Sequence, residues 1–488
     1  MTPEVRDRID QIRQGIVPEG YKKTKSGILP ESWSVRTIAE CLERVEHPVE
    51  VQANEMYTQI GIRSHGKGLF YKEPVTGDSL GNKSVFWIEP DCFILNIVFA
   101  WEQAIGKTTQ AEAGMIGSHR FPMYRPINGS IDIDYLISYL LTKRGTDILE
   151  AASPGGAGRN RTLGQDRFMK SRIVLPPLDE QKKIAEILST QDKAIELQGR
   201  KIEELKRFKK GCLEKMFPRK GQKVPEKRFP GFTDDWEQRK LSDLAEKTYG
   251  GGTPTTSNEA YWNGDIPWIQ SSDVVDGKLL GVEPRKWITQ GGLNNSAAQL
   301  IPENSIAIIT RVGVGKLAFM PYSYATSQDF LSLSKLNVEP FFAVYACYKK
   351  LQSELNAVQG TSIKGITKDE LLAKSIMVPR YAEQQQIGAF FKQLDNLITL
   401  HQRKLEEMKK QKKALMQLLL TGIVRVKAMN QKEIQEHLTK EALKRIVDNS
   451  PNYTEQIKQD LKNIIDAGNT PEEILQATLL YFAALHLS

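Results

Sequence analysis

The residues of this 488-residue chain that are best suited to chemistry are polar side chains in loops, interspersed with cations and aromatic rings. Arg, Lys, Asn and Gln can read base edges bidentately, while Ser, Thr and backbone amides bind phosphates. For any single residue a solvated loop is the better interpretation, but the set predicts contact with nucleic acid. The candidates are Arg63, Ser64, His65, Lys67, Ser118, His119, Arg120, Arg159, Asn160 and Arg161 in the first half, and Thr253, Thr255, Ser257, Trp262, Ser271, Ser272, Arg311, Ser327 and Gln328 in the second.

Catalytic patterns are missing from the sequence. Gly106-Lys107-Thr108 looks like the end of a phosphate-binding loop, but Trp101 stands where the first glycine is needed, so we reject that interpretation. The six histidines are scattered without metal-binding spacing, and no nucleophile elbow occurs. The Asn/Asp-Pro-Pro-aromatic loop of amino-methyltransferases is also missing. We therefore predict no catalytic residue, no metal site and no cofactor bound by this chain.

The elements that position these loops follow from a stretch that occurs twice, at an offset of 203 residues (379 − 176). Both copies start with a proline and a Glu-Gln pair and continue as a predicted long helix. The offset also matches a tryptophan that opens each half. The matched residues are Trp33 with Trp236, Pro176 with Pro379, Glu180-Gln181 with Glu383-Gln384, and Asp166 with Asp369. Each half is therefore predicted to be a globular segment followed by a helix.

The two long helices carry apolar residues at coiled-coil spacing, which predicts that they pair with each other. The alternative is that each helix packs only on its own globular segment. Both copies interrupt the seam at the same places, with Gln198 or His401 and with Lys209 or Lys412. The predicted seam residues are Ile184, Leu188, Ile195, Ile202, Leu205, Ile387, Phe391, Leu394, Ile398, Leu405 and Met408.

The predicted fold class is α/β (α+β), with two mixed α/β domains, two long antiparallel helices and a pseudo-two-fold internal repeat. The edges of the two globular segments align at the constant offset, whereas their middles share almost nothing. The predicted parts are an N-terminal helix and connector (1–29), a first globular domain (30–175), a first helix (176–217), a linker (218–232), a second domain (233–378), a second helix (379–427) and an extra helical segment (428–488).

Local patterns predict the following elements within these parts. Helices are expected at 2–16, 35–45, after Trp236, 133–152 and 341–358, and three short ones within 429–488. Strands are expected within 56–62, 84–88, 92–101 and 171–175, and a hairpin at 304–320. Residues 17–29 are expected to be a connector.

Composition sets broad limits. The 67 basic and 59 acidic side chains give a formal charge of +8, which suits a polyanionic partner without proving one. The four cysteines form no CxxC pair, which favours a reducing cytoplasm. No signal peptide or membrane-spanning apolar run is present in the sequence, so we expect a soluble cytoplasmic protein with no membrane partner.

Several motifs resemble those of a known family, the DNA-specificity subunits of type I restriction–modification systems. The resemblance covers roughly residues 17–425 and rests on the two P-x-x-x-E-Q helix starts and the two opening tryptophans. It is also carried by the passages PDCFILNIVFAWEQA, GMIGSHRFPMYRP and GGTPTTSNEAYWNGDIPWIQSSD. Residues 429–488 depart from the family pattern, which puts in doubt whether the chain is a single natural reading frame.

The resemblance implies a non-catalytic subunit whose two target-recognition domains each read one half of a split, asymmetric DNA target. It also implies that the helices are conserved spacers that set the gap, and that two methyltransferase subunits and restriction (translocase) subunits dock on this chain. S-adenosylmethionine, ATP and Mg²⁺ would then be bound by those partners. The alternatives left open are a coiled-coil assembly scaffold without sequence-specific DNA binding and, less favoured by the missing motifs, a stand-alone DNA enzyme.

Overall fold

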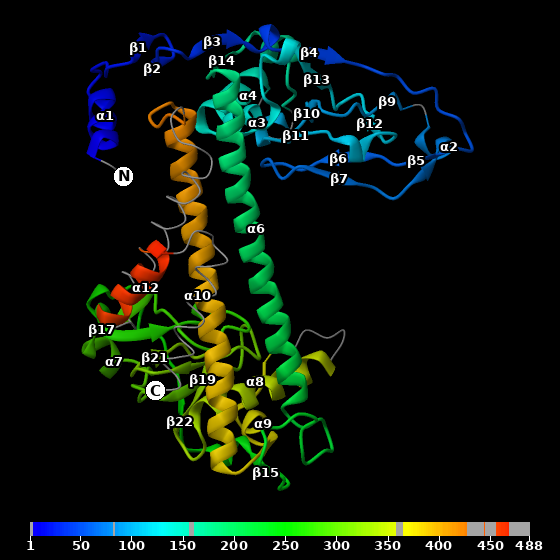
Figure 1. Ribbon diagram of the computed structural model, residues 1–488. Coiled ribbons are helices and arrows are strands. Elements are labelled where there is room, and N and C mark those ends of the chain that lie inside the picture. The colour runs from blue at the N-terminus through cyan, green and yellow to red at the C-terminus, as the bar shows by residue number, and fades with distance from the viewer. Residues whose placement is uncertain are drawn as a thin grey trace. The chain divides into compact units, whose positions relative to one another are not determined.

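The computed structural model describes residues 3–81, 83–155, 161–357, 365–426, 444 and 455–467. The chain forms two compact units, residues 1–192 together with 410–488, and residues 193–409. Each unit contains a large hydrophobic core of its own. Figure 1 labels the helices and strands of each unit.

The first unit begins with α1 (Pro3–Arg13), which confirms the predicted N-terminal helix. Residues 17–29, predicted to be a connector, contain most of a β-hairpin of β1 (Tyr21–Thr24) and β2 (Gly27–Pro30), which was not predicted from the sequence. Gly27 takes a left-handed φ of 109° at the turn, a conformation open to glycine. Tyr21 and Leu29 are buried, which anchors the hairpin to the rest of the unit.

The helix predicted at 35–45 is wrong. The chain forms β3 (Ser34–Thr37), a single 3-10 turn η1 (Ile38–Glu40) and β4 (Leu42–Val45). Strand pairing decides this, because β3 pairs with β14 (Arg172–Leu175) and β4 pairs with β13 (Met123–Pro126). Local apolar spacing fitted a helix, but distant partners supply the ladder hydrogen bonds. The helix predicted after Trp236 is wrong for the same reason, since β15 (Glu237–Lys240), η5 (Leu241–Leu244) and β16 (Ala245–Gly250) occupy its place.

The central sheet of the first unit is antiparallel, in the order β11-β10-β13-β4. Its other members are β10 (Phe93–Leu95) and β11 (Ile105–Lys107). The helix predicted at 133–152 is two helices, α3 (Ile133–Leu140) and α4 (Lys143–Ala152), because the Thr142 side chain caps α4 by accepting from the Gly145 amide. A further helix, α5 (Gln165–Lys170), precedes β14.

Smaller elements of the first unit complete its globular part. They are β5 (Met56–Tyr57), β6 (Ile60–Ile62), β7 (Leu69–Tyr71), β8 (Val75–Thr76), α2 (Gly77–Leu80), β9 (Val85–Trp87), η2 (Ala100–Glu102), η3 (Gln110–Glu112), β12 (Ile116–Ser118) and η4 (Ile127–Gly129). The predicted strands at 56–62 and 84–88 are thus confirmed in shortened form. The run at 92–101 is a strand only at its start and ends in η2.

The second unit contains an antiparallel sheet in the order β16-β22-β19-β20. Strands β19 (Ser305–Ile309) and β20 (Leu317–Met320) form the hairpin predicted at 304–320, and β22 is Phe330–Leu336. The predicted helix at 341–358 is confirmed as α8 (Pro340–Ala357). The remaining elements are η6 (Glu259–Tyr261), β17 (Trp262–Ile269), η7 (Ser271–Asp273), β18 (Lys286–Ile288), α7 (Gln290–Asn294), β21 (Ala325–Thr326), α9 (Lys368–Leu372) and β23 (Ser375–Val378).

The two central sheets have the same topology, although their sequences share little. The order β4-β13-β10-β11 in the first unit corresponds to β16-β22-β19-β20 in the second. The pair β3 and β14 likewise corresponds to the pair β15 and β23. The internal repeat therefore extends through the middle of each globular part.

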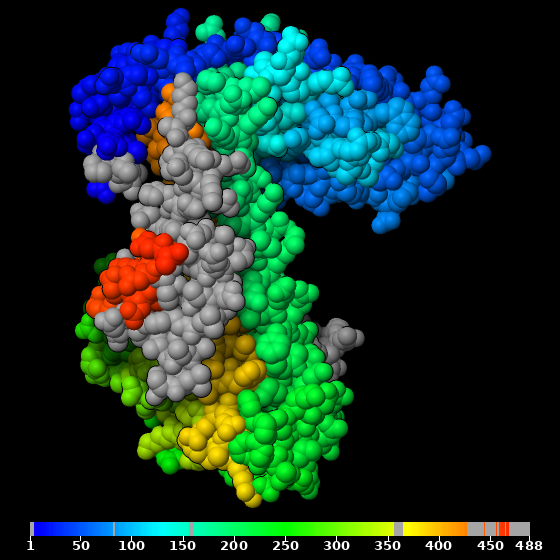
Figure 2. Space-filling model, viewed as in Figure 1, coloured from blue at the N-terminus to red at the C-terminus, as the bar shows by residue number. Residues whose placement is uncertain are grey.

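Both predicted long helices are present, α6 (Leu178–Lys215) with 38 residues and α10 (Tyr381–Leu420) with 40. The surface of α6 can be followed over much of its length in the space-filling view (Figure 2). Of the three helices predicted within 429–488, α12 (Glu455–Ala467) is described, and most of the remaining segment lies outside the described residues.

Candidate nucleic-acid-binding site

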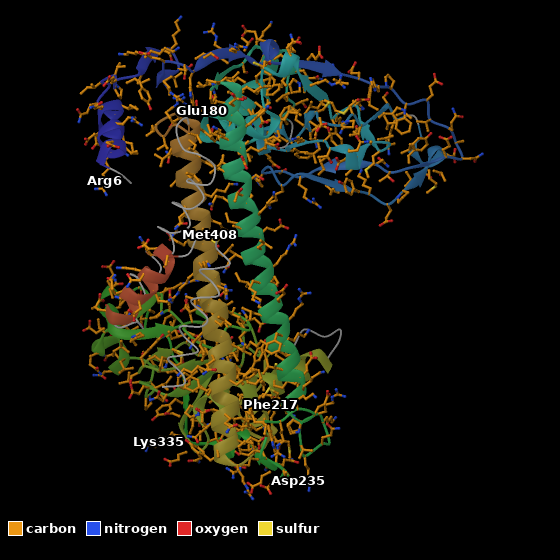
Figure 3. All side chains as sticks on the ribbon, viewed as in Figure 1. Arg6, Glu180, Phe217, Asp235, Lys335 and Met408 are labelled. Carbon is orange, nitrogen blue, oxygen red and sulfur yellow. The ribbon has the colours of Figure 1, made fainter. Side chains whose placement is uncertain are left out.

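The Glu-Gln pair at the start of α6 joins this helix to the first unit. The buried Glu180 carboxylate accepts from Trp33 Nε1 at 3.0 Å and from both Nε and a terminal nitrogen of Arg425 at 2.7 and 2.8 Å. Gln181 accepts from the Asp132 amide at 2.9 Å and donates to the Pro176 carbonyl at 2.9 Å. Glu180 lies where the start of α6 meets the end of α10 (Figure 3).

The second unit repeats this joint. Arg228 donates twice to Glu383, at 2.8 and 2.7 Å, and Gln384 bonds to the Glu339 amide and the Pro379 carbonyl at 2.9 and 2.8 Å. One difference is Trp236, whose Nε1 has no hydrogen-bond partner in the described part of the chain, whereas Trp33 Nε1 donates to Glu180. All four Glu and Gln side chains are buried. The two Glu-Gln pairs, which mark the repeat in the sequence, therefore stabilise the fold, and their buried side chains cannot contact a ligand.

The seam between α6 and α10 is antiparallel and carries matched polar contacts. In the second unit Gln198 Nε2 lies 2.8 Å from His401 Nδ1 and donates to its carbonyl at 2.9 Å, and these two residues are 203 apart, so equivalent positions meet. Lys209 binds Asp395 there at 2.6 Å. In the first unit Lys412 binds Asp192 at 2.5 Å, which is the same pair shifted by 203. The polar seam positions predicted from the sequence thus have partners, and the two aspartates were missed.

The predicted apolar seam residues are divided between helix pairing and the domain cores. Ile184 and Leu188 lie in the core of the first unit, which also contains Leu419 and Leu420 of α10. Ile387, Phe391 and Leu394 lie in the core of the second unit together with Leu213 of α6. Ile202 and Ile398 are buried, and Ile195, Leu205, Leu405 and Met408 are half-buried.

Each central sheet has one edge where three loops meet, and we call it the loop edge. In the first unit it comprises residues 96–98, 118–121 and 161–164, and in the second unit residues 309–311, 327–330 and 365–367. The Ile97 amide donates to the Arg120 carbonyl at 3.0 Å, and the Leu163 amide donates to the Ile97 carbonyl at 2.8 Å. In the second unit the amides of Thr310 and Ile366 make the same two bonds, to Asp329 and Thr310, at 2.8 and 2.7 Å.

The first-unit candidates gather at or beside the loop edge. Ser118, His119, Arg120 and Arg161 belong to it, and the Arg161 guanidinium lies 5.4 Å from the centre of the Trp101 ring. The hairpin that carries residues 63–67 approaches the same loop, because Ser64 Oγ and the His65 amide bond to Glu102 at 3.0 and 2.8 Å.

The hairpin carries two of the candidate cations, Arg63 and Lys67. Arg63 donates to the Leu69 carbonyl at 2.5 Å and lies over the Phe70 ring, so its own hairpin holds it. Lys67 is exposed. The candidates Arg159 and Asn160 lie outside the described residues.

The second-unit candidates gather at the corresponding edge. Thr253 Oγ1 donates to Gln328 Oε1 at 2.7 Å, and Arg311 is exposed on the neighbouring loop. Ser327 is buried, its amide donates to the Ile269 carbonyl at 2.9 Å, and its hydroxyl has no partner among the described residues.

The remaining candidates of the second unit line the adjoining loops. Ser271 and Ser272 follow β17 directly after Gln270, and Thr255 accepts from Trp262 Nε1 at 3.2 Å. Ser257 is exposed in the same loop as Thr255. Sequence reasoning missed Lys286, whose ammonium lies 5.5 Å from the centre of the Trp262 ring. The sequence offers one signal for this contact, because the cation Lys286 directly precedes Trp287 in β18.

Across the described part of the chain, no group of three or more His, Cys, Asp or Glu residues could hold a metal ion. No helix among those residues is long and apolar enough to cross a membrane. At the loop edges the available chemistry is hydrogen bonding by amide, imidazole and hydroxyl groups, together with positive charge and, in the second unit, the carboxylate of Asp329.

Two globular parts of matching topology, each with a polar loop edge and each packed against residues of both long helices, define a duplicated recognition protein. The family model described as "Type I restriction modification DNA specificity domain" matches residues 85–207 and again residues 233–410. These matches cover more than half of the chain, and the chain belongs to this family.

Two similar proteins align with most of this chain, and a third aligns with part of it. The MjaX specificity subunit of Methanocaldococcus jannaschii is 26% identical over 84% of this chain and 97% of its own length. The type I restriction enzyme MjaVIII specificity subunit of the same organism is 24% identical, over 86% of this chain and 99% of its own length. The Escherichia coli EcoR124I/EcoR124II specificity subunit is 30% identical over 33% of this chain and 41% of its own.

Solved structures support the fold. A chain from a type I R-M system superposes with a TM-score of 0.53 at 19% identity, covering 81% of this chain and 99% of that one. The type I restriction-modification S subunit from M. genitalium gives a TM-score of 0.50 at 13% identity, over 79% of this chain and 96% of that one. The chain is thus a type I restriction–modification specificity subunit with DNA-recognition domains.

Proposed function

We propose that each recognition domain reads one half of a split, asymmetric target in double-stranded DNA through its loop edge. The observation that carries this proposal is that two domains of the same topology present different polar residues at the same edge. One scaffold with two different contact sets suits two different half-sites, because base edges are distinguished by the pattern of donors and acceptors offered to them. The candidates at the loop edges would make these contacts.

The helix pair, in this proposal, sets the length of the unread gap. Helices of 38 and 40 residues extend about 57–60 Å at 1.5 Å per residue. That length is ample for two domains about one turn of DNA apart, or about 34 Å. The matched polar contacts of the seam support a fixed register, since a slipped register would leave Lys209 and Asp395 without each other.

Two methyltransferase subunits and the restriction subunits would dock on this chain, which itself performs no catalysis. S-adenosylmethionine, ATP and Mg²⁺ would be bound by those partners. Two exposed leucines support two equivalent docking points on the helix pair. Leu197 of α6 and Leu400 of α10 are 62% and 63% exposed, and they are equivalent positions 203 apart (400 − 197).

The test is the methylation pattern of genomic DNA from cells that express this chain with its methyltransferase subunit. A split, asymmetric motif methylated on adenine in both halves is the expected result. Exchanging residues 30–175 for another domain should change one half only, and inserting a whole heptad within 182–210 should lengthen the gap only. Changes in both halves after either manipulation would contradict the modular assignment.

The assembly-scaffold alternative makes a different prediction. A scaffold would bind DNA weakly and with little dependence on salt, whereas a reader that neutralises phosphates loses affinity steeply as salt rises. If no motif is methylated, removing residues 429–488 and repeating the experiment separates a blocked reader from a chain that does not read DNA.

A further inference from the structure

The two loop edges contain one turn in common. Residues 118–121 read Ser-His-Arg-Phe, and residues 327–330 read Ser-Gln-Asp-Phe. Each turn follows a strand in parallel contact with an earlier segment, through an isolated bridge of Gln59 with Ile116 in the first unit and through the pair Trp268 and Ala325 of β17 and β21 in the second. Each then enters the second strand of the central sheet, β13 or β22.

The same backbone hydrogen bonds hold both turns. The Phe121 amide donates to the Ser118 carbonyl at 2.8 Å, and the Phe330 amide donates to the Ser327 carbonyl at 3.4 Å. The carbonyl of the third residue accepts from the loop-edge amide of Ile97 or Thr310, as described above. The two turns therefore share these two backbone bonds and their position, and the first turn has a further bond from the His119 amide to the Ser84 carbonyl at 3.2 Å.

The second residue of each turn is exposed and differs in chemistry. His119 and Gln328 are both exposed, whereas the fourth residue is half-buried in one turn and buried in the other. The conformation of the turn depends on its backbone bonds, so the second side chain is free to differ. Thr253 further orients Gln328 by donating to its amide oxygen at 2.7 Å.

We propose that His119 and Gln328 are equivalent specificity-determining residues, each reading the corresponding base pair of its own half-site. This inference rests on the proposed function of the two domains. An exposed glutamine offers an adjacent donor and acceptor, which match N7 and N6 of adenine in the major groove. The amide oxygen of Gln328 keeps a second lone pair for adenine N6 while it accepts from Thr253.

Histidine favours a different base. An imidazole can present an N–H to the base edge, where guanine offers two acceptors, N7 and O6, and adenine offers only N7 beside a donor. The assignment is therefore adenine opposite Gln328 and guanine opposite His119. Thr253 acts as a positioning residue, since it touches Gln328 and the proposal does not require it to touch a base.

The experiment exchanges the two side chains in the full chain, assembled with its methyltransferase subunit, and maps the methylated motif. H119Q should convert one guanine of the first half-site to adenine, and Q328H should convert one adenine of the second half-site to guanine. The unchanged half of the motif reports that each variant is folded and assembled. Q290H, at an exposed glutamine of α7 outside the loop edge, is the matched control and should leave the motif unchanged.

Binding to synthetic duplexes gives the magnitude. Relative to the wild-type chain, Q328A should lose roughly 5- to 150-fold in preference for the correct base pair at one position, the range for a single bidentate contact of 1–3 kcal/mol at about 1.4 kcal/mol per tenfold. H119A should lose less at its own position, because an imidazole offers the base a single donor. An unchanged motif in both exchange variants would overturn the inference, as would changes at several positions. The absence of any split motif for the wild-type complex would instead refute the proposed function.

Discussion

The most discriminating test of the helix seam is K209M, because the equivalent lysine on the other helix has a different environment. The Lys209 and Asp395 side chains are only 9% and 13% exposed, and Asp395 also accepts from the Tyr345 hydroxyl at 2.6 Å. Burial and the nearby carboxylate raise the pKa of Tyr345, so its hydroxyl stays protonated and continues to donate. Removing one partner of a buried pair costs about 3–5 kcal/mol, and the remaining tyrosine bond places K209M near the lower figure.

The matched control is K412M. Lys412 pairs with Asp192, and this pair is more exposed to solvent, with side chains 21% and 57% exposed. Without the lysine, water solvates Asp192, so the loss of stability in K412M should stay below about 1 kcal/mol. Hydrogen exchange of α10 peptides around residues 395–409 measures the difference. Exchange limited by local opening should accelerate roughly 150-fold in K209M, which corresponds to about 3 kcal/mol. The double variant K209M/D395N should recover most of the loss. Equal effects of K209M and K412M would refute the argument from burial.

Three further perturbations test other parts of the fold. R228A should destabilise its unit by about 3 kcal/mol or more, and R425A should destabilise its own unit by less. The reason is that Glu180 keeps the hydrogen bond from Trp33, whereas Trp236 donates no bond to Glu383 among the described residues. Hydrogen exchange at the start of α10 for R228A and at the start of α6 for R425A compares the two losses. Burial and the charges of Lys404 and Lys201 lower the pKa of His401, so its contribution to stability is complete above about pH 6.5 and is lost as pH falls through the folded pKa; urea midpoints at pH 8 and pH 5 should differ less in H401Q. Truncation after Leu420 removes the Tyr21 bond to Gly422 and the Arg425 bonds to Glu180, so limited proteolysis should cut residues 30–175 faster than in a chain ending after residue 428.

The parts of the fold that local rules govern were predictable from the sequence. Both long helices, the hairpin at 304–320 and α8 form where apolar period, end charges and turn residues indicate them. The helix predicted at 35–45 failed because β3 pairs with Arg172–Leu175, far along the chain, and a local pattern cannot reveal that partner. The polar contacts of the seam were half predicted, since the lysines interrupt the heptads visibly while Asp192 and Asp395 resemble ordinary surface residues.

The sequence predicts the candidate residues only as a set, and it does not reveal the correspondence between His119 and Gln328. The repeat offset is 203 at the ends of each unit, whereas these two residues are 209 apart (328 − 119). Loops of different length in the middle of each domain shift the alignment by a few residues, so a constant offset hides the match. Strand order and backbone hydrogen bonds restore it, because they do not depend on loop length.

Burial explains why the repeat holds at the joints and differs at the loop edges. Glu180 and Glu383 are buried charges, and losing either arginine removes the opposite charge from a buried carboxylate, at a cost of several kcal/mol. An exposed turn residue is different, because substitutions away from buried contacts usually change stability by less than about 0.5 kcal/mol. Since backbone bonds fix the turns at 118–121 and 327–330, His119 and Gln328 can be exchanged with little effect on folding. A marked loss of stability in H119Q or Q328H would show that these side chains support the turn, and the separation of recognition from folding would then be wrong.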